Sequence, residues 1–250
     1  MTRPLQTTLI VLIVTLAAAP AVFAQAGTFT GRGFILVNGG YQVGGHDFEQ
    51  VSTLRANAED GSFTTDYDVK NGPSFDVAGG ANVWRRLAIG VGVTRFSRST
   101  PSTLNGSVPH PFFFNRPRPV SGDITGLKRE ELAIHVEAIA TAPIRRRLQV
   151  MAFGGPSFFR VEQGVVSTFA WSESYPYDEA SFSSATTIDA DGSKIGVNVG
   201  GDVAFFFSRQ VGVGGSIRYS AATVEIDMAG GSHDVKAGGL QAGGGLRLRF

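Results

Sequence analysis

The chain has 250 residues, of which 33 are glycine, none is cysteine and only 17% are charged. This charged fraction lies below the roughly 25% of ordinary soluble domains, and the glycine excess argues against a helical bundle or a helix-rich enzyme. A formal net charge of +1 offers no basic surface for nucleic acid. The lack of cysteine excludes disulfides, zinc–thiolate sites and cysteine nucleophiles.

The first 24 residues have the layout of a secretory signal peptide. Arg3 precedes an apolar run over residues 9–18, and small residues follow up to Gln25. We expect cleavage after Ala24, with cleavage after Ala26 as the alternative, so that residues 25–250 form the mature barrel domain. The apolar run is shorter than the roughly 20 residues that a membrane-spanning helix needs.

Apolar residues alternate with small or polar residues along most of the remaining chain, which is the pattern of β-strands. We expect eight strands, near residues 29–43, 75–83, 87–94, 132–138, 148–165, 197–207, 211–219 and 235–250. The stretch 62–69 also alternates, and a ten-stranded count follows if it pairs as a separate strand.

The connections between these strands alternate in length. Short turns are expected at 84–86, 143–147 and 208–210, and long loops at 44–62, 99–122 and 167–189, with a shorter one at 229–234. This rhythm predicts an all-β protein, an eight-stranded antiparallel up-and-down transmembrane β-barrel with short turns at one rim and long loops at the other.

One face of each expected strand carries bulky apolar side chains, and the other is rich in glycine and alanine. Because an eight-stranded barrel has an interior only just wide enough for side chains, we expect the small residues inside and the apolar face toward lipid. Aromatic residues are expected at the long-loop rim (Tyr41, Phe75, Phe96, Tyr219) and at the short-turn rim (Trp84, Phe205, Phe207, Phe250). Trp84 and Phe96 break the parity of their strands, which predicts turns or bulges there.

Seven polar residues of the inward face are expected to form a network inside the barrel: Arg32, Asp76, His135, Glu137, Asp202, Arg218 and Arg247. An unpaired charge in a sealed interior costs several kcal/mol, and three acids stand against three arginines. The network therefore predicts pairing across the lumen and no continuous wide channel.

Three consecutive phenylalanines, Phe112, Phe113 and Phe114, lie in the proline-rich segment 108–119. Because exposed apolar patches are costly in water, two interpretations stay open. The segment either folds over the barrel rim and plugs it, or contacts a partner, a lipopolysaccharide headgroup zone or a small apolar ligand. A second aromatic loop that contains Trp171 is a candidate to join it.

Residues capable of catalysis or metal binding are few. The histidines His46, His110, His135 and His233 show no metal-ligand spacing, so we expect no metal and no cofactor. His135, Glu137 and Ser216 are a candidate serine–histidine–acid set, but their lumen-facing parity favours an internal hydrogen-bond network. We therefore expect no enzymatic activity.

The last expected strand places Leu246, Leu248 and Phe250 on the outward face, with Gly245 five residues before the end. In these residues and in its strand pattern, the chain resembles the small outer-membrane β-barrels of Gram-negative bacteria, the OmpA/OmpW-like transmembrane barrels. The resemblance implies that Gly245, Leu248 and Phe250 are the signal read by the barrel-assembly machinery. OmpA itself carries a soluble peptidoglycan-binding domain after its barrel, and none is expected here.

The resemblance also implies a place in the cell outer membrane after export, outer-membrane lipid and lipopolysaccharide as partners, and a monomer. The leading hypothesis is a non-enzymatic barrel with a structural or surface-binding role through its extracellular loops. The alternatives are a narrow pore or carrier for small or hydrophobic molecules, as in OmpW-like barrels, and a lipid-modifying outer-membrane enzyme.

Overall fold

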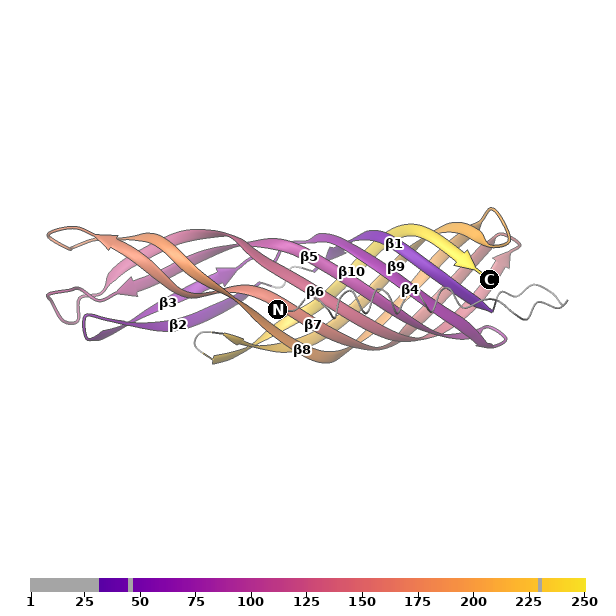
Figure 1. Cartoon of the computed structure of the whole chain (residues 1–250), viewed down its shortest axis with the longest axis horizontal. Helices are drawn as coiled ribbons and strands as arrows, with labels where there is room; N and C mark the ends of the chain where they lie inside the picture. Colours follow the sequence, from indigo (N-terminus) through magenta and orange to yellow (C-terminus); the bar gives the residue numbers. More distant parts are fainter. Residues whose placement is uncertain (1–31, 45–46, 229–230) are drawn as a thin grey trace, which may run out of the picture. The chain divides into compact units, whose positions relative to one another are not determined.

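The computed structural model describes residues 32–44, 47–228 and 231–250, and most of these residues lie in antiparallel strands (Figure 1). The expected signal peptide, the first residues of the first expected strand and His46 lie outside the described residues. In the described part, no helix is long and apolar enough to cross a membrane.

The strands are β1 (Gly33–Val43), β2 (Phe48–Ala56), β3 (Glu59–Tyr67), β4 (Gly72–Trp84), β5 (Leu87–Val108), β6 (Arg118–Arg145), β7 (Leu148–Glu173), β8 (Ala180–Phe206), β9 (Val211–Met228) and β10 (Gly231–Arg249). Eight of them close into a ring in the order β4-β1-β10-β9-β8-β7-β6-β5 and back to β4, with every neighbour antiparallel. The expected eight-stranded barrel is confirmed.

The other two strands form a hairpin outside the ring. β2 pairs with β3, and β3 pairs with the far half of β5, where Ser62 lies opposite Ser107 and Tyr67 opposite Ser102. The alternating stretch 62–69 is therefore a strand of its own for most of its length, but it widens the sheet beside β5 instead of entering the ring.

The short turns are confirmed, but the long loops are not loops over most of their length. β5 continues to Val108 and β6 begins at Arg118, while β7 continues to Glu173 and β8 begins at Ala180. Together with β2 and β3, these outer strand segments form what we call the extension: residues 98–108, 118–130, 161–173, 180–193, 222–228 and 231–237.

The apolar face of a strand changes side between the ring and the extension, as β6 shows. In the ring, Val136 is exposed and Glu137 is buried, whereas in the extension Val120 is buried and Ser121 is exposed. The ring therefore has the outward apolar surface of a membrane barrel, and the extension has the inward apolar core of a water-soluble one. The core of the extension includes Phe63, Tyr67, Leu104, Val161, Phe169 and Ile226.

The outward face of the ring carries a belt of exposed apolar side chains, which includes Ile89, Val91, Val136, Phe158, Val197, Val199, Ile217 and Leu246. Tyr41, Phe75 and Tyr219 are exposed at one rim of this belt, and Trp84, Phe205, Phe207 and Phe250 at the other. Trp84 follows a register shift between β4 and β5, so the expected bulge is confirmed. Phe96 lies at the height of the rim, opposite Ser74, and its broken parity turns the side chain inward, where it is buried. The bulge expected there is wrong, because β5 pairs regularly on both sides at this position.

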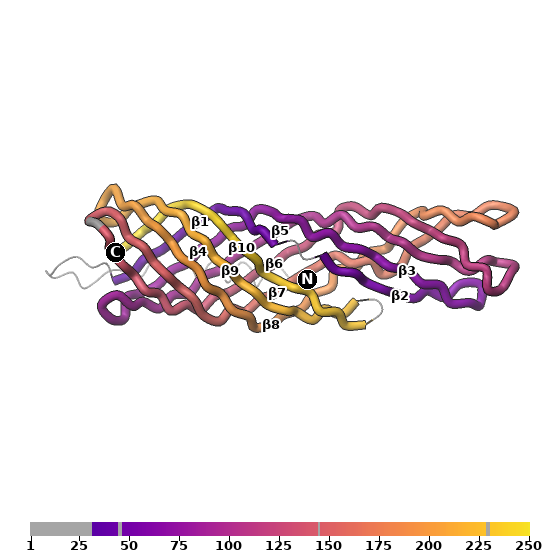
Figure 2. Tube along the Cα trace, turned by 180° about the vertical axis from the view of Figure 1, so that it is seen from behind, coloured from indigo at the N-terminus to yellow at the C-terminus, as the bar shows by residue number. Residues whose placement is uncertain are grey.

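The hairpin of β2 and β3 is fastened across the extension to β7. The Tyr67 hydroxyl donates to Gln50 Oε1 at 2.6 Å and accepts from the Val166 backbone N–H at 2.8 Å. Gln50 Nε2 donates to the Val166 carbonyl at 3.2 Å. These bonds satisfy polar groups inside an apolar core, and they fix where the β2–β3 hairpin lies (Figure 2).

Candidate functional site

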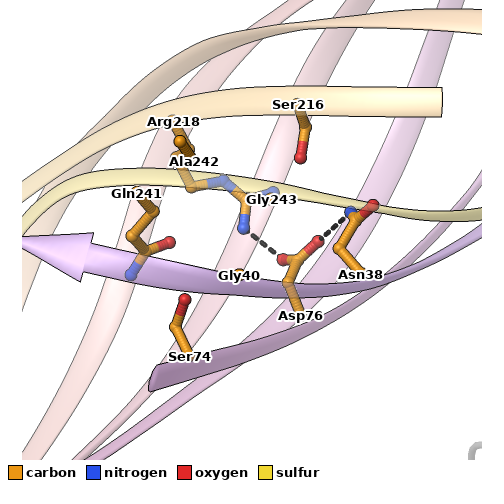
Figure 3. Close-up of a pocket in the computed structure, with 9 residues that line it drawn as sticks. All are labelled: Asn38, Gly40, Ser74, Asp76, Ser216, Arg218, Gln241, Ala242 and Gly243. Atoms are coloured by element: carbon orange, nitrogen blue, oxygen red, sulfur yellow. Dashed lines mark hydrogen bonds and ion pairs between the residues drawn. The ribbon is translucent and has the colours of Figure 1, made fainter. Parts of the chain in front are cut away.

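Charged side chains from three strands meet inside the ring. Arg218 of β9 pairs with Asp76 of β4 and, at 2.9 Å, with Glu137 of β6. Asn38 of β1 donates to Asp76 at 2.9 Å, and Figure 3 shows Arg218 and Asn38 approaching Asp76 from opposite sides. The side chains of Arg218 and Glu137 are 6% and 2% exposed, so this pair lies in a region from which water is largely excluded.

The space beside the Arg218–Asp76 pair is small. A cavity of about 20 Å³ is lined there by Gly40, Ser216 and Gln241, among others. A single water needs about 10–15 Å³ of such space, so the cavity has room for roughly one water.

A second ion pair lies nearer the short turns. Arg247 of β10 pairs with Asp202 of β8, with Nε 3.0 Å from Oδ2, and both side chains are fully buried. An apolar cluster fills the space beside it and consists of Phe34, Leu36, Ala78, Ala88, Ile139, Met151 and Phe153. Polar pairs and apolar side chains together occupy this part of the interior.

A third buried pair was missed by the sequence analysis. Arg129 Nε lies 2.7 Å from Glu131 Oε1, and Glu131 Oε2 accepts the Gly238 backbone N–H at 2.9 Å. Arg129 Nη2 donates to the Lys236 carbonyl at 2.6 Å. Both residues precede position 132, where the expected strand began, although they continue its inward parity.

His135 lies in a chain of hydroxyl groups. Its Nδ1 lies 2.7 Å from Ser157 Oγ and its Nε2 lies 3.0 Å from Thr94 Oγ1, which donates to Asp76 at 3.1 Å. The serine at His135 is thus Ser157 and not Ser216, which lines the cavity beside Asp76. His135 and Ser157 are almost fully buried, so this pair offers no path for a substrate to reach the Ser157 hydroxyl.

Arg32 does not join the residues above. It lies one residue before β1 with its side chain exposed, and its carbonyl accepts the Asn82 backbone N–H at 2.8 Å. The expectation that Arg32 belongs to the interior network is wrong, because Arg32 lies just before β1 at the end of the ring, where its side chain is exposed.

The pairing of β1 with β10 closes the ring along a glycine-rich seam. A Cβ atom at Gly245 would overlap the carbonyl oxygen of Val37, so only glycine allows this approach of the two backbones. The Phe250 backbone N–H donates to the Gly33 carbonyl at 3.0 Å, and Leu248 faces outward opposite Ile35. These positions are those of a closing strand, and the reading of these residues as an assembly signal stays a prediction.

Three hairpin ends meet at the far end of the extension, and we call them the tip: residues 55–60, 109–118 and 173–179 (Figure 1). Arg118 is their buried clamp. Its guanidinium lies 2.6 Å from Glu173 Oε2 and donates to the carbonyls of Pro109 at 2.9 Å and Tyr177 at 3.0 Å. The third end is joined through Glu59, whose carboxylate accepts the Asn115 backbone N–H at 2.8 Å.

The tip displays aromatic side chains to solvent. Phe112, Phe113 and Phe114 are 68%, 55% and 73% exposed, and Tyr175 is 86% exposed. The expectation that the phenylalanines plug the barrel rim is wrong, because the strands carry them past the rim on a hairpin end. His110 is buried beneath them, and its Nδ1 accepts the backbone N–H groups of Phe112 and Phe113.

Neighbouring rings fix parts of this aromatic surface. The Phe112 and Tyr177 ring centroids are 5.4 Å apart, and the Arg116 guanidinium lies 5.6 Å from the centroid of Phe113. Trp171 lies apart from the tip, partly buried against Phe169 beside the core of the extension. Over the described ranges, no group of three or more histidine, aspartate or glutamate side chains is placed to hold a metal ion.

No protein-family model matches the chain, and no curated protein matches it. Several solved structures match the chain. Ail, the attachment invasion locus protein of Yersinia pestis, in complex with the heparin analogue sucrose octasulfate, is 12% identical with a TM-score of 0.38 over 87% of this chain and 99% of Ail. Neisserial surface protein A is 15% identical with a TM-score of 0.39 over 87% of this chain and 97% of its own.

The outer membrane protease OmpT from Escherichia coli is 7% identical with a TM-score of 0.46, over 90% of this chain and 99% of OmpT. These proteins are small Gram-negative outer-membrane β-barrels, the group that the sequence resembles. The likeness concerns the fold alone and assigns no activity to the chain.

Proposed function

We propose that the protein is a non-enzymatic outer-membrane β-barrel, closed to solute flow, that binds partners through the tip of its extension. The exposed apolar belt supports the membrane location. An eight-stranded ring with valines and isoleucines outside and ion pairs inside is stable only where hydrocarbon covers its outer face. We also propose that outer-membrane lipid and lipopolysaccharide surround this belt.

The interior supports a closed barrel over a pore. Arg218 bridges carboxylates from two strands, and Arg247 with Asp202 blocks the section nearer the short turns. A continuous water path would require at least one of these pairs to separate, which leaves buried charges without partners at a cost of several kcal/mol. The burial of Ser157 and His135 likewise speaks against a lipid-modifying enzyme.

The binding function is supported above all by one observation: the phenylalanines are exposed to solvent although the hairpin ends that carry them are held in place by other contacts. Contiguous apolar side chains on a soluble surface usually mark a site of interaction. Here a buried arginine, Arg118, holds the hairpin ends in place while Phe112 and Phe114 stay in solvent. Such an arrangement stabilises an outward-facing apolar surface instead of letting it collapse onto the core.

Single-cysteine labelling tests the location and the orientation together, because the chain has no cysteine of its own. In intact cells, a membrane-impermeant maleimide is expected to label Phe114→Cys at the tip. Arg146→Cys, in the turn between β6 and β7, is the matched control and is expected to react only after lysis. Labelling of Arg146→Cys alone on intact cells would contradict the proposed orientation.

Planar-bilayer recording tests closure. The purified, refolded protein is expected to show no steady conductance, whereas a steady conductance would favour the narrow pore or carrier. Mass spectrometry of lipid A after expression addresses enzymatic activity, and an unchanged profile is expected.

A further inference from the structure

We propose that the tip docks onto a second lipid bilayer, one with zwitterionic, choline-bearing headgroups, and not onto the membrane that holds the ring. This inference rests on the proposed surface-binding function and names its partner. It follows from the shape, rigidity, charge and reach of the tip.

The aromatic surface has the chemistry of a membrane interface. Phe112, Phe113, Phe114 and Tyr175 project from hairpin ends and are at least half exposed. Phenylalanine and tyrosine are side chains that bury an apolar body at the level of lipid headgroups, and tyrosine keeps its hydroxyl in water. Side chains that project from a hairpin end suit insertion between lipids.

The backbone that presents these side chains is already ordered. His110 accepts two consecutive backbone N–H groups below the phenylalanines, and Arg118 joins the β5–β6 end to the β7–β8 end. A preorganised surface loses less conformational entropy when it binds than a flexible loop does. Insertion therefore needs little reorganisation of the tip.

The charge of the tip selects among lipid surfaces. Two of its arginines are committed to carboxylates, Arg118 to Glu173 at 2.6 Å and Arg116 to Asp178 at 3.0 Å. Carboxylates exceed guanidiniums in the tip, which holds Glu59, Asp60, Glu173, Asp178 and Glu179 against Arg55, Arg116 and Arg118.

An aromatic surface with excess negative charge repels anionic lipids. It suits a quaternary ammonium group, which is attracted to the faces of aromatic rings and to carboxylates. Phe112 and Tyr177 meet edge to face. Tyr177 is followed in sequence by Asp178, which is paired with Arg116, and by the exposed Glu179, so a ring of this pair and an exposed carboxylate lie on the same hairpin end.

The length of the extension places the tip too far above the membrane that holds the ring for the tip to insert into that membrane. Phe75 marks the rim of the belt and lies opposite Arg95 on β5, which continues to Val108. At about 3.3 Å per residue and a tilt near 40°, these roughly 13 residues raise the tip about 33 Å above the rim. The phenylalanines are therefore beyond the headgroups around the ring and are free to meet a facing bilayer.

Vesicle flotation with the full-length mature protein in lipid nanodiscs tests the proposal. Nanodiscs that hold the protein are expected to float with phosphatidylcholine vesicles and not with phosphatidylglycerol vesicles, while empty nanodiscs stay below. The variant Phe112→Ser/Phe113→Ser/Phe114→Ser is expected to lose at least about tenfold in affinity for phosphatidylcholine. Val51→Ser, which removes an exposed apolar side chain from β2 in the same extension, is the matched control and is expected to bind as the native chain does.

Heat-dependent gel mobility shows that each variant is folded before flotation. Undiminished flotation of the triple phenylalanine variant, or a preference for phosphatidylglycerol, would overturn the proposal. The proposal would also be overturned if Phe114→Cys is labelled on intact cells but nanodiscs that hold the protein fail to float with phosphatidylcholine vesicles. That last result would leave the surface-binding function standing and would indicate a protein or glycan partner instead of a bilayer.

Discussion

Removal of the positive charge of Arg218 tests whether the interior network holds the ring together. Arg218 pairs with Asp76 and Glu137, whose side chains are 15% and 2% exposed. Arg218→Met keeps much of the side-chain volume but leaves two carboxylates without a counter-ion where solvent screens them little. Breaking a buried ion pair costs about 3–5 kcal/mol, so the free energy of unfolding is expected to fall by about that amount.

Urea unfolding of the barrel in phospholipid vesicles, followed by intrinsic fluorescence, measures this difference. The matched control is Arg95→Met, because Arg95 pairs with Glu130 at 3.0 Å but is 57% exposed. Exposed ion pairs contribute about 0–1 kcal/mol, so this control is expected to unfold close to the native midpoint.

A rescue variant separates the loss of charge balance from the loss of packing. Adding Asp76→Asn and Glu137→Gln to Arg218→Met removes both uncompensated charges, and most of the lost stability is expected to return. The reasoning is refuted if Arg218→Met costs no more than Arg95→Met, or if the triple variant is no more stable than the single one.

Three further outcomes follow from the structure. Gly245→Ala places a Cβ against the Val37 carbonyl and is expected to prevent ring closure, which is seen as loss of the folded gel band. The control Gly39→Ala is expected to fold, because a Cβ at Gly39 meets no described atom within 4 Å. Burial raises the pKa of Tyr67 from 10.0 to about 12. Its stabilising contribution is therefore complete below pH 10 and lost as the pH rises through about 12, and ultraviolet phenolate titration is expected to lose its late component in Tyr67→Phe. Arg118→Ala is expected to raise amide exchange in the tip about tenfold or more while the ring keeps its gel mobility, and unchanged exchange would contradict the clamp.

The ring was predictable because local alternation and side-chain size agree there. Along residues 87–94 every second side chain is apolar and its neighbours are small, so the strand and its faces follow from the sequence. The extension was not, and β8 shows why. Its outer residues Ser183, Ser184, Thr186 and Thr187 are all exposed, and the residues that pack against the core, Ala180, Phe182 and Ala185, do not keep a spacing of two. This segment is a strand because β7 pairs with it, which is a non-local fact.

For the candidate site, the sequence predicted most of the residues that face the interior but not which of them contact one another. Parity places His135 on the inward face, yet it does not say which serine lies at the same height across the barrel. Register decides this, and it brings Ser157 to His135 while Ser216 lines the cavity near Asp76. Arg32 has the right parity but lies before the first ring strand, so height and not face excludes it.

The change of apolar side between ring and extension fixes how deeply the protein is immersed. On β6 the outward residues Lys128 and Glu130 are followed, two residues further along the same face, by Leu132, Ile134 and Val136. If the ring moved a few ångströms deeper, these charged side chains would enter the hydrocarbon core of the membrane. If it moved outward by as much, the aliphatic side chains would be exposed to water, so both displacements cost free energy. The amino-acid sequence therefore sets the level at which the ring sits in a bilayer, and with it the height of the phenylalanines above the belt, whatever the thickness of that bilayer.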